Sequence, residues 1–341
     1  MNGLVNKGWS VAFLLVILLL LLVANISMGS VAIPPGEMLK SLVGSETSVS
    51  LYSDILFKFR IPKAVTCLLA GSALAVGGLL MQTLFRNPLA GPDVLGLSSG
   101  ASLMVAFIIL LGRESYYYIP TASPWTLALA ASTGSALVFL LIMAAAHRIK
   151  NNASILIIGL MISAAAGSLV GVLQFVSNAR DLQVFTIWTL GNVGSTSWNE
   201  IIVLTISLGI GTMLAWSSIK SINAWLLGDN YAQSLGINLK RSRLLIVLAT
   251  CIMVGGVTAF CGPIAFVGLA VPHLVRMLIP TADHKILIPM VMIGGSALLL
   301  FCDILAQLPG SASVLPLNAV TSIIGAPVVI WVVVKSSGIR L

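Results

Sequence analysis

The sequence has very few charged residues. Only 8% of its 341 residues are Asp, Glu, Lys or Arg, whereas soluble globular domains average about 25%. Apolar residues make up 58% of the chain and the mean hydropathy is +1.07. This composition excludes a soluble globular protein and indicates a membrane protein.

Metal-ligating side chains are also scarce. The chain has four cysteines, which lie in or at the ends of apolar runs without a CxxC pair, and three histidines without an HExxH motif. We therefore expect reduced, buried cysteines and neither a metal site nor a resident cofactor. His273 and Arg276 fall near one end of an apolar run, where we expect them to anchor that run to neighbouring carbonyls or lipid headgroups.

Motifs for nucleotide binding and catalysis are missing as well. The chain has three Lys-Ser pairs, and none follows the glycines of a phosphate-binding loop. No nucleophile with a neighbouring base, and no metal motif, points to an intramembrane enzyme. The sequence thus predicts a protein that is not an enzyme and does not itself hydrolyse ATP.

Long apolar runs are abundant. Ten of them approach the length that a helix needs to cross the hydrocarbon layer of about 30 Å. We therefore expect an all-α polytopic membrane protein whose residues 1–341 form a single transmembrane domain. The predicted spans lie near residues 11–29, 61–84, 94–112, 125–146, 153–176, 199–219, 242–261, 264–280, 286–306 and 314–334.

The distribution of basic residues predicts the orientation in the membrane. With ten spans, both termini lie on one side, and that side holds 12 of the 18 Lys and Arg residues. Cytoplasmic segments carry such an excess, so we expect both termini in the cytoplasm. The net charge of +8 then reflects membrane topology and contact with lipid headgroups, not binding of nucleic acid.

Two of the spans are predicted to form a hairpin. The span at residues 61–84 is followed by the letters RNPLAGP at 86–92, where the prolines cannot continue a helix. The chain must turn there before the next span. Gly96 and Gly100 are spaced one helical turn apart, which allows another helix backbone to approach closely.

The connection at residues 220–243, here called the inner segment, is neither apolar enough to cross a membrane nor a low-complexity linker. We expect one or two short surface helices broken at Gly228 and Gly236. Small residues such as Ala232 allow docking on a partner, whereas an amphipathic helix lying at the membrane surface has a similar pattern. The spacing by itself leaves these two interpretations open.

The stretch from RIPK at residues 60–63 to RNPLAGPDVLGLSSGA at 86–101 resembles the permease subunits of ABC importers for vitamin B12, iron-siderophores and heme. Similar signatures occur at residues 188–198, 227–236, 262–276 and 323–331. The resemblance implies a permease in the bacterial inner membrane that moves a metal chelate, an iron-siderophore before cobalamin or heme. It also implies a homodimer, two copies of a separate ATPase that uses ATP and Mg²⁺, and a periplasmic or lipid-anchored binding protein.

The resemblance assigns the inner segment to the coupling helices that dock on the ATPase. The residues that match this motif are Leu227, Gly228, Asp229, Asn230, Tyr231, Ala232, Gln233, Ser234, Leu235 and Gly236. It therefore favours docking over the surface-helix interpretation. A bulky charge at Ala232 is then expected to uncouple transport without unfolding the permease.

Further roles follow from the same resemblance. Arg60 and Lys63 lie three residues apart on one helical face. From the residues alone, basic side chains at a span end favour anchoring at headgroups. The resemblance implies instead that both meet acidic residues of the binding protein. Asn87, Pro88 and Leu89 correspond to the family's inner gate, the name used below for residues 87–89.

The span at residues 153–176 lines the pathway in the resembling family. Ser163, Ser168 and Gln174 are accordingly expected to give it a weakly polar lining. Such a lining suits a large chelate whose metal is already fully coordinated.

An ion-coupled secondary transporter is the alternative function. It would need acidic groups inside the membrane, and Asp303 is the only one within a predicted span. Because Asp303 lies near the outer end, we expect it to be paired or to cap a helix. The chain also departs from the family pattern at Gln307, where a basic residue is usual, and at Val314, where many members have a glutamate.

Overall fold

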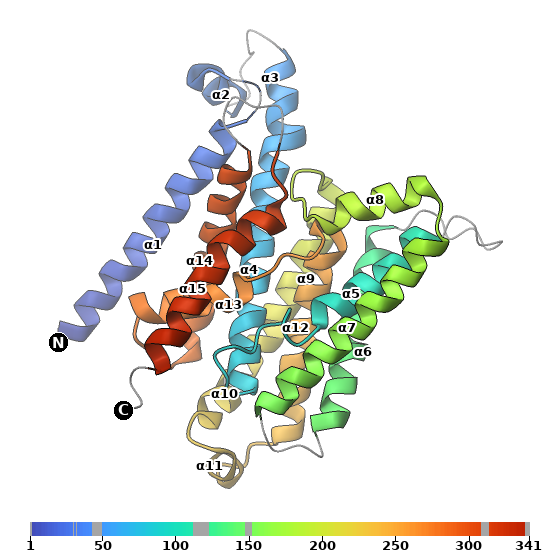
Figure 1. The fold of residues 1–341 in the computed structure, drawn as a ribbon. Coiled ribbons are helices and arrows are strands. Elements are labelled where there is room, and N and C mark those ends of the chain that lie inside the picture. Colours follow the sequence, from blue (N-terminus) through green and yellow to red (C-terminus); the bar gives the residue numbers. More distant parts are fainter. Residues whose placement is uncertain are drawn as a thin grey trace.

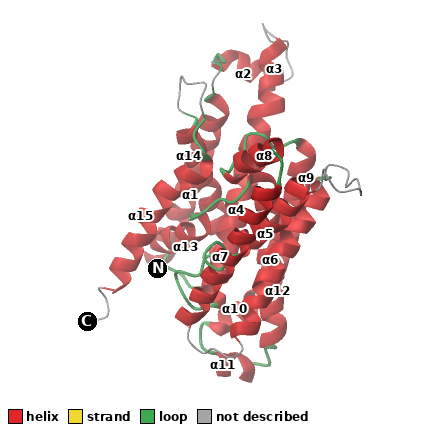
Figure 2. Cartoon of the chain, turned by 45° about the vertical axis from the view of Figure 1, so that its right-hand side comes forward, coloured by secondary structure: helices red, strands yellow, loops and turns green. Residues whose placement is uncertain are grey.

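The computed structural model describes residues 2–29, 31, 33–42, 50–111, 123–146, 152–307 and 314–337, and these are helical with no strand among them (Figures 1 and 2). The elements are α1 (Asn2–Ser27), α2 (Pro35–Leu42), α3 (Ser50–Ile55), η1 (Leu56–Arg60), α4 (Ile61–Leu84), α5 (Leu97–Ala106), η2 (Phe107–Leu111), α6 (Pro124–Ala146), α7 (Asn152–Val176), α8 (Ala179–Thr189), α9 (Trp198–Ser217), α10 (Ile219–Trp225), α11 (Asp229–Ser234), α12 (Leu239–Cys261), α13 (Val267–Leu278), α14 (His284–Ala306) and α15 (Leu317–Ser337).

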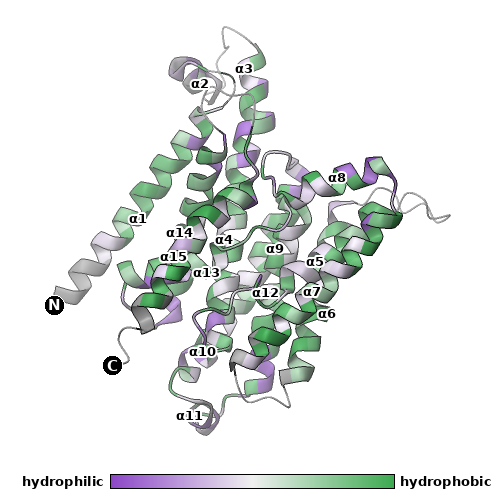
Figure 3. Ribbon diagram, viewed as in Figure 1, coloured by the Kyte–Doolittle hydropathy of each residue, from purple (hydrophilic) through white to green (hydrophobic). Residues whose placement is uncertain are grey.

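Seven helices in the described part are long and apolar enough to cross a membrane. They confirm the apolar runs expected at α1, α4, α6, α7, α9, α12 and α14. Figure 3 shows that the outer helices of the bundle are predominantly hydrophobic along their length. The chain is therefore a polytopic helical membrane protein.

Two of the remaining three runs form shorter helices than expected, and the third is shifted by three residues along the chain. The run predicted at residues 94–112 is helical from Leu97 through Leu111, and α15 starts at Leu317. The run predicted at 264–280 forms α13, whose 12 residues extend only about 18 Å. Gly262 and Phe266 have φ angles of +70° and +66°, and these left-handed conformations prevent α12 and α13 from continuing into each other.

Helix α4 lies at the centre of the bundle and packs on α9, α12, α13 and α14. Its small residues make this possible. A Cβ at Gly71 would overlap the backbone of Gly295 in α14, and one at Gly78 would overlap the backbone of Gly268 in α13. Because both helices have glycine at the crossing point, their backbones approach closely and the van der Waals contact between them increases.

Glycines of α7 behave differently. No atom lies within 4 Å of a Cβ built at Gly167 or Gly171. Within one chain, no close helix packing is therefore found at these two positions. Gly167 borders a cavity, and Gly171 lies one turn from Phe175, which is 90% exposed.

The connection between α4 and α5 starts at the surface, where Arg86 and Pro88 are exposed, and then runs into the bundle. Ala90, Gly91 and Leu95 are fully or nearly buried. The φ angles of +46° at Arg86 and +78° at Gly96 turn the chain back before α5 begins. Figure 1 shows this segment crossing from the lower end of α4 to the side of α7. Residues 85–96 are thus a re-entrant turn within the helical body.

The two ends of the molecule are distinct. Helices α2 and α3 project at one end, and α10 and α11 form the other (Figures 1 and 2). Helix α1 begins, and helix α15 ends, away from α2 and α3.

Candidate transport and coupling sites

The inner gate is a compact turn held by its own backbone and by α13. Asn87 Oδ1 accepts a hydrogen bond of 2.9 Å from the backbone N–H of Leu89. On the other side, His273 Nε2 donates to the carbonyl oxygen of Pro88 over 2.9 Å. The structure thus brings the three predicted gate residues together and ties them to α13.

A second contact joins α13 to α4. Arg276 Nη1 donates to Gln82 Oε1 at 3.1 Å, and Gln82 Nε2 donates to the carbonyl of Leu269 at 3.2 Å. Together with the bond from His273 to Pro88, these contacts confirm the anchoring role expected for His273 and Arg276. Both side chains serve packing between helices next to the inner gate.

The inner segment forms two short helices, as expected. Helix α10 ends at Trp225, and α11 occupies Asp229–Ser234. The breaks fall at Gly228 and Gly236, whose φ angles are +113° and +78°. Such angles strain any residue with a Cβ, so glycine is required at both positions.

The exposed surface of the inner segment differs from the expected one. Leu227 and Leu235 are 67% and 58% exposed, and Asn230, Tyr231, Gln233 and Ser234 are also exposed. Ala232, in contrast, is 0% exposed. The expectation that Ala232 offers a docking surface is wrong, because α11 packs this face onto α10 and α12. The side chain of Asp229 lies outside the described part of the chain.

Arg60 does not form an exposed cationic patch. It is 4% exposed, and its guanidinium donates to the carbonyls of Ile26 at 2.9 Å, Ser27 at 2.7 Å and Val31. The last carbonyls of α1 have no partner within their own helix, and Arg60 supplies one. The predicted outward projection of Arg60 is therefore wrong, and headgroup anchoring does not describe it either.

Lys63 is likewise engaged inside the protein. Its Nζ lies 3.1 Å from Asp303 Oδ2, and both side chains are largely buried. The same carboxylate accepts from Asn25 Nδ2 at 2.6 Å and from Gln307 Nε2 at 2.7 Å. This confirms that Asp303 is paired, and it gives Gln307 a role at the position where the family usually has a basic residue.

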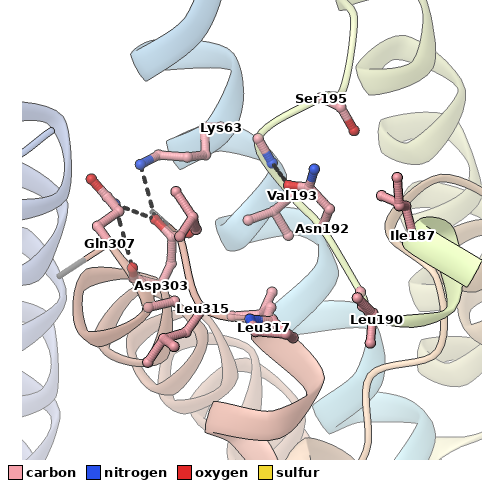
Figure 4. A pocket seen from close by; sticks show the side chains of 15 residues that line it. Lys63, Ile187, Leu190, Asn192, Val193, Ser195, Asp303, Gln307, Leu315 and Leu317 are labelled. Atoms are coloured by element: carbon pink, nitrogen blue, oxygen red, sulfur yellow. Dashed lines mark hydrogen bonds and ion pairs between the residues drawn. The ribbon is translucent and has the colours of Figure 1, made fainter. Parts of the chain in front are cut away.

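These side chains face a cavity of about 380 Å³ at the outer end of the bundle (Figure 4). Lys63, Asp303 and Gln307 line one wall, and Asn192 and Ser195 line another. Val314, which replaces the usual glutamate, also borders this cavity.

The predicted pathway residues of α7 do not gather in one site. Ser163 Oγ and Ser168 Oγ donate to carbonyls of their own helix, at Gly159 and Ala164. Gln174 is half-buried on the same helix. A neighbouring cavity of about 280 Å³ is lined instead by other residues of α7, with α5, α8, the start of α15 and the turns before α5 and α13.

Asp93 also lines that cavity, and no pattern in the sequence pointed to it as a functional residue. Ser98 Oγ donates to its Oδ1, and Ser102, Thr189 and Asn318 share the lining. None of the ion pairs among the described residues involves Asp93. Asp93 lies in the turn before the predicted span at 94–112, so it adds an acidic group beside the spans to Asp303 within one. The residue follows Gly91-Pro92, and only the re-entrant turn places it inside.

An apolar helical bundle with a buried polar turn, interior cavities and a separate exposed inner segment defines a membrane transport protein. The FecCD transport family matches residues 16–335, and the chain belongs to this family.

Curated relatives cover nearly the whole chain. The hemin transport system permease HmuU of Yersinia pestis is 33% identical over 98% of both chains. The vitamin B12 import permease BtuC of Klebsiella pneumoniae is 33% identical over 98% of this chain and 95% of its own.

Solved structures give the same fold. An inward-facing metal-chelate type ABC transporter superposes with a TM-score of 0.79 and 25% identity, over 94% of this chain and 97% of the other. PsaBC from Streptococcus pneumoniae, with a TM-score of 0.57 and 15% identity over 82% and 94%, shares the fold alone.

Proposed function

We propose that the chain is the membrane permease of an ATP-driven importer in the bacterial inner membrane. Two copies form the pathway, two copies of a separate ATPase supply the energy, and a binding protein delivers the cargo from outside. Family membership along residues 16–335 is the observation that carries this proposal. The exposed Leu227, Tyr231 and Leu235 offer an apolar surface on which the ATPase docks.

The proposed cargo is a large metal chelate, either heme or a corrinoid. Relatives named for hemin and for vitamin B12 are both 33% identical to this chain, so neither cargo is favoured by identity alone. An iron-siderophore remains a prediction from the sequence.

The proposed topology has ten membrane crossings with both termini in the cytoplasm. It combines the seven long apolar helices with the three shorter ones. The excess of basic residues places α10 and α11 on the cytoplasmic side, where an ATPase is found. Helices α2 and α3 then face outward. Because Arg60 and Lys63 are engaged inside the protein, we propose α2 and α3 as the contact for the binding protein.

Ion-coupled secondary transport is not favoured. Family membership points to an ABC importer, and the ion pair of Asp303 with Lys63 occupies a carboxylate that an ion-coupled mechanism would use.

Reconstitution tests the proposal. The permease and an ATPase encoded beside it are placed in liposomes with the binding protein, and uptake of hemin and cyanocobalamin is measured with and without ATP. We expect ATP-dependent uptake of one of them. Uptake driven by an ion gradient without ATP would contradict the proposal.

Docking through the inner segment has its own test. Leu227→Asp with Leu235→Asp should weaken ATPase binding while the permease stays folded, because both side chains are exposed. Ala232→Asp should instead unfold α11, because this side chain is buried. ATPase co-purification and limited proteolysis distinguish the two outcomes. Normal co-purification of the double leucine variant would place the docking surface elsewhere.

A further inference from the structure

Three side chains connect α10 of the inner segment to the inner end of α4. Asn223 in α10 accepts at Oδ1 from the backbone N–H of His284 over 3.0 Å, and the same oxygen lies 2.8 Å from His284 Nδ1. On the opposite side of the ring, His284 Nε2 lies 2.9 Å from Thr83 Oγ1. His284 and Thr83 are buried. Contacts that span 61 and 201 positions of the chain thus form one continuous chain of hydrogen bonds.

The surroundings fix the proton positions in this chain. Asn223 Nδ2 donates to Asp283 Oδ1 at 2.7 Å, so the amide oxygen must face His284. Nδ1 therefore carries the ring proton, and Nε2 of the neutral imidazole is the acceptor that faces Thr83. The Thr83 hydroxyl also lies 2.8 Å from the carbonyl oxygen of Leu79 in its own helix, so its single proton is shared between that carbonyl and Nε2. The backbone N–H of Lys285, followed by the Asn223 amide, holds the pKa of Asp283 below its usual range. Asp283 consequently stays charged and keeps the amide in this orientation.

A second hydrogen bond runs parallel to the first chain. Arg86 Nη2 donates to the carbonyl oxygen of Trp225, the last residue of α10, at 3.0 Å. Arg86 immediately precedes the inner gate and has a φ angle of +46°. Thr83 lies one helical turn before Arg86. Both contacts of α10 therefore act on the few residues that lead into the inner gate.

We propose that Asn223, His284 and Thr83 form a relay that passes movement of the inner segment to the inner gate. The inference rests on the proposed function, in which the ATPase binds the inner segment. Separating Thr83 from His284 would leave the buried Nε2 of the ring without a partner, which is unfavourable away from water. Helix α10 accordingly moves together with the start of α14 and the end of α4. His284 is a positioning residue in this relay, since it touches neither cargo nor nucleotide.

The relay differs from a static structural link in what it transmits. A static link would affect stability alike in all states of the complex. A relay also changes how the gate responds when the ATPase binds ATP. Coupling between the inner segment and the inner gate requires an element with two arrangements whose equilibrium both sites influence. The test must therefore measure the conformation of the gate itself.

A cysteine reporter at the gate provides that readout. Leu89→Cys is introduced into the permease, whose four native cysteines are buried, and the complex with its ATPase is placed in nanodiscs. Maleimide labelling rates are measured without nucleotide and after trapping with ATP and vanadate. Thr83→Val removes the hydroxyl but keeps the shape, and Thr83→Ser keeps the hydroxyl. Thr66→Val is the matched control, because Thr66 is buried in the same helix and donates to Pro62 within α4.

We expect the ATP-dependent change in labelling to shrink about fivefold in Thr83→Val, the equilibrium effect of losing one buried hydrogen bond. Thr83→Ser and Thr66→Val should keep the full change, and ATP turnover should persist in every variant. A Thr83→Val variant that responds like the parent would overturn the relay. If the parent itself shows no response to ATP, the proposed function has failed instead, so the two failures are distinguishable.

Discussion

Asp303 is the side chain on which the outer end of the bundle depends. One carboxylate accepts from Lys63, Asn25 and Gln307, which join α4, α1 and the end of α14. Charges removed from water need such complete pairing, because desolvation otherwise outweighs the attraction between them. Among the described residues, the buried Oδ1 of Asn25 has no hydrogen-bond donor. Within this part of the chain, the network therefore contains no free donor that could replace a lost contact.

Asp303→Ala should therefore lower the free energy of unfolding by about 3 to 5 kcal/mol, the cost of leaving one buried charge unpaired. Chemical denaturation in detergent measures it. Asp54→Ala is the control, because the pair of Asp54 with Lys58 has the same distance of 3.1 Å but is exposed; its loss should cost no more than about 1 kcal/mol. Equal effects of the two substitutions would contradict the prediction.

Asp93 is the side chain expected to influence cargo. Its carboxylate lies in a cavity beside α7, with hydroxyl groups but no cation in the described part of the lining. Hemin carries two carboxylates and cyanocobalamin carries amides, so Asp93 repels the first and accepts hydrogen bonds from the second. At about 10 Å and an effective dielectric constant of about 20, the repulsion amounts to about 1.7 kcal/mol.

Asp93→Asn should raise hemin uptake relative to cyanocobalamin uptake by roughly twentyfold, the rate equivalent of such an energy. The comparison is made in liposomes with saturating ATPase. Ser102→Ala changes the same cavity without changing its charge and should leave the ratio near that of the parent. If only one cargo is imported, Asp93→Asn should speed hemin or slow cyanocobalamin. An unaltered rate in the Asn variant would exclude Asp93 from the pathway.

At the level of helices, the crossing of α4 and α14 depends on two glycines. Gly71 and Gly295 meet backbone to backbone, and a Cβ on either would overlap the other chain segment. Separation of these helices would also loosen the contact of Ser72 with Ser296, whose hydroxyls lie 2.9 Å apart.

Gly71→Ala is expected to lower stability by roughly 1 to 3 kcal/mol, as for other overpacked cores. Thermal unfolding in detergent tests this. The comparison variant is Gly171→Ala in α7, which meets no atom within 4 Å and should be neutral or slightly stabilising, since alanine favours a helix. A stable Gly71→Ala together with a destabilised Gly171→Ala would show that packing at the crossing has been misjudged.

The topology proposed above gives the whole molecule a polarity in the membrane. Helices α10 and α11 lie at one end, and α2 and α3 lie at the other. Exposed apolar side chains such as Phe175 lie on the outer face of α7. Lipid or a second copy of the chain would shield this face from water.

Impermeant maleimide applied to intact cells should label Lys58→Cys in η1 but not Ser234→Cys in α11. Both positions are exposed on the protein, and the native cysteines are buried. Ser234→Cys should react only after the membrane is opened, because the positive side faces the cytoplasm. The reverse pattern would invert the proposed topology.

The sequence by itself determined the membrane class and most helix boundaries. An uninterrupted apolar run such as residues 61–84 has one stable form in lipid, because a helix satisfies its backbone internally. The helix breaks at Gly228 and Gly236 were also predictable from the sequence, because the positive φ angles of these glycines need no tertiary contact. The pairing of Asp303 was foreseen because an isolated charge within a span is costly.

Only the tertiary structure decided which polar and small side chains remain accessible. Arg60 is covered by carbonyls about 30 residues away, Ala232 by neighbouring helices, and Asp93 is carried inward by a re-entrant turn. Likewise, His284 meets Thr83 across 201 positions of the chain. Periodicity and local propensity describe a residue's own helix, whereas burial depends on which distant helix lies against it.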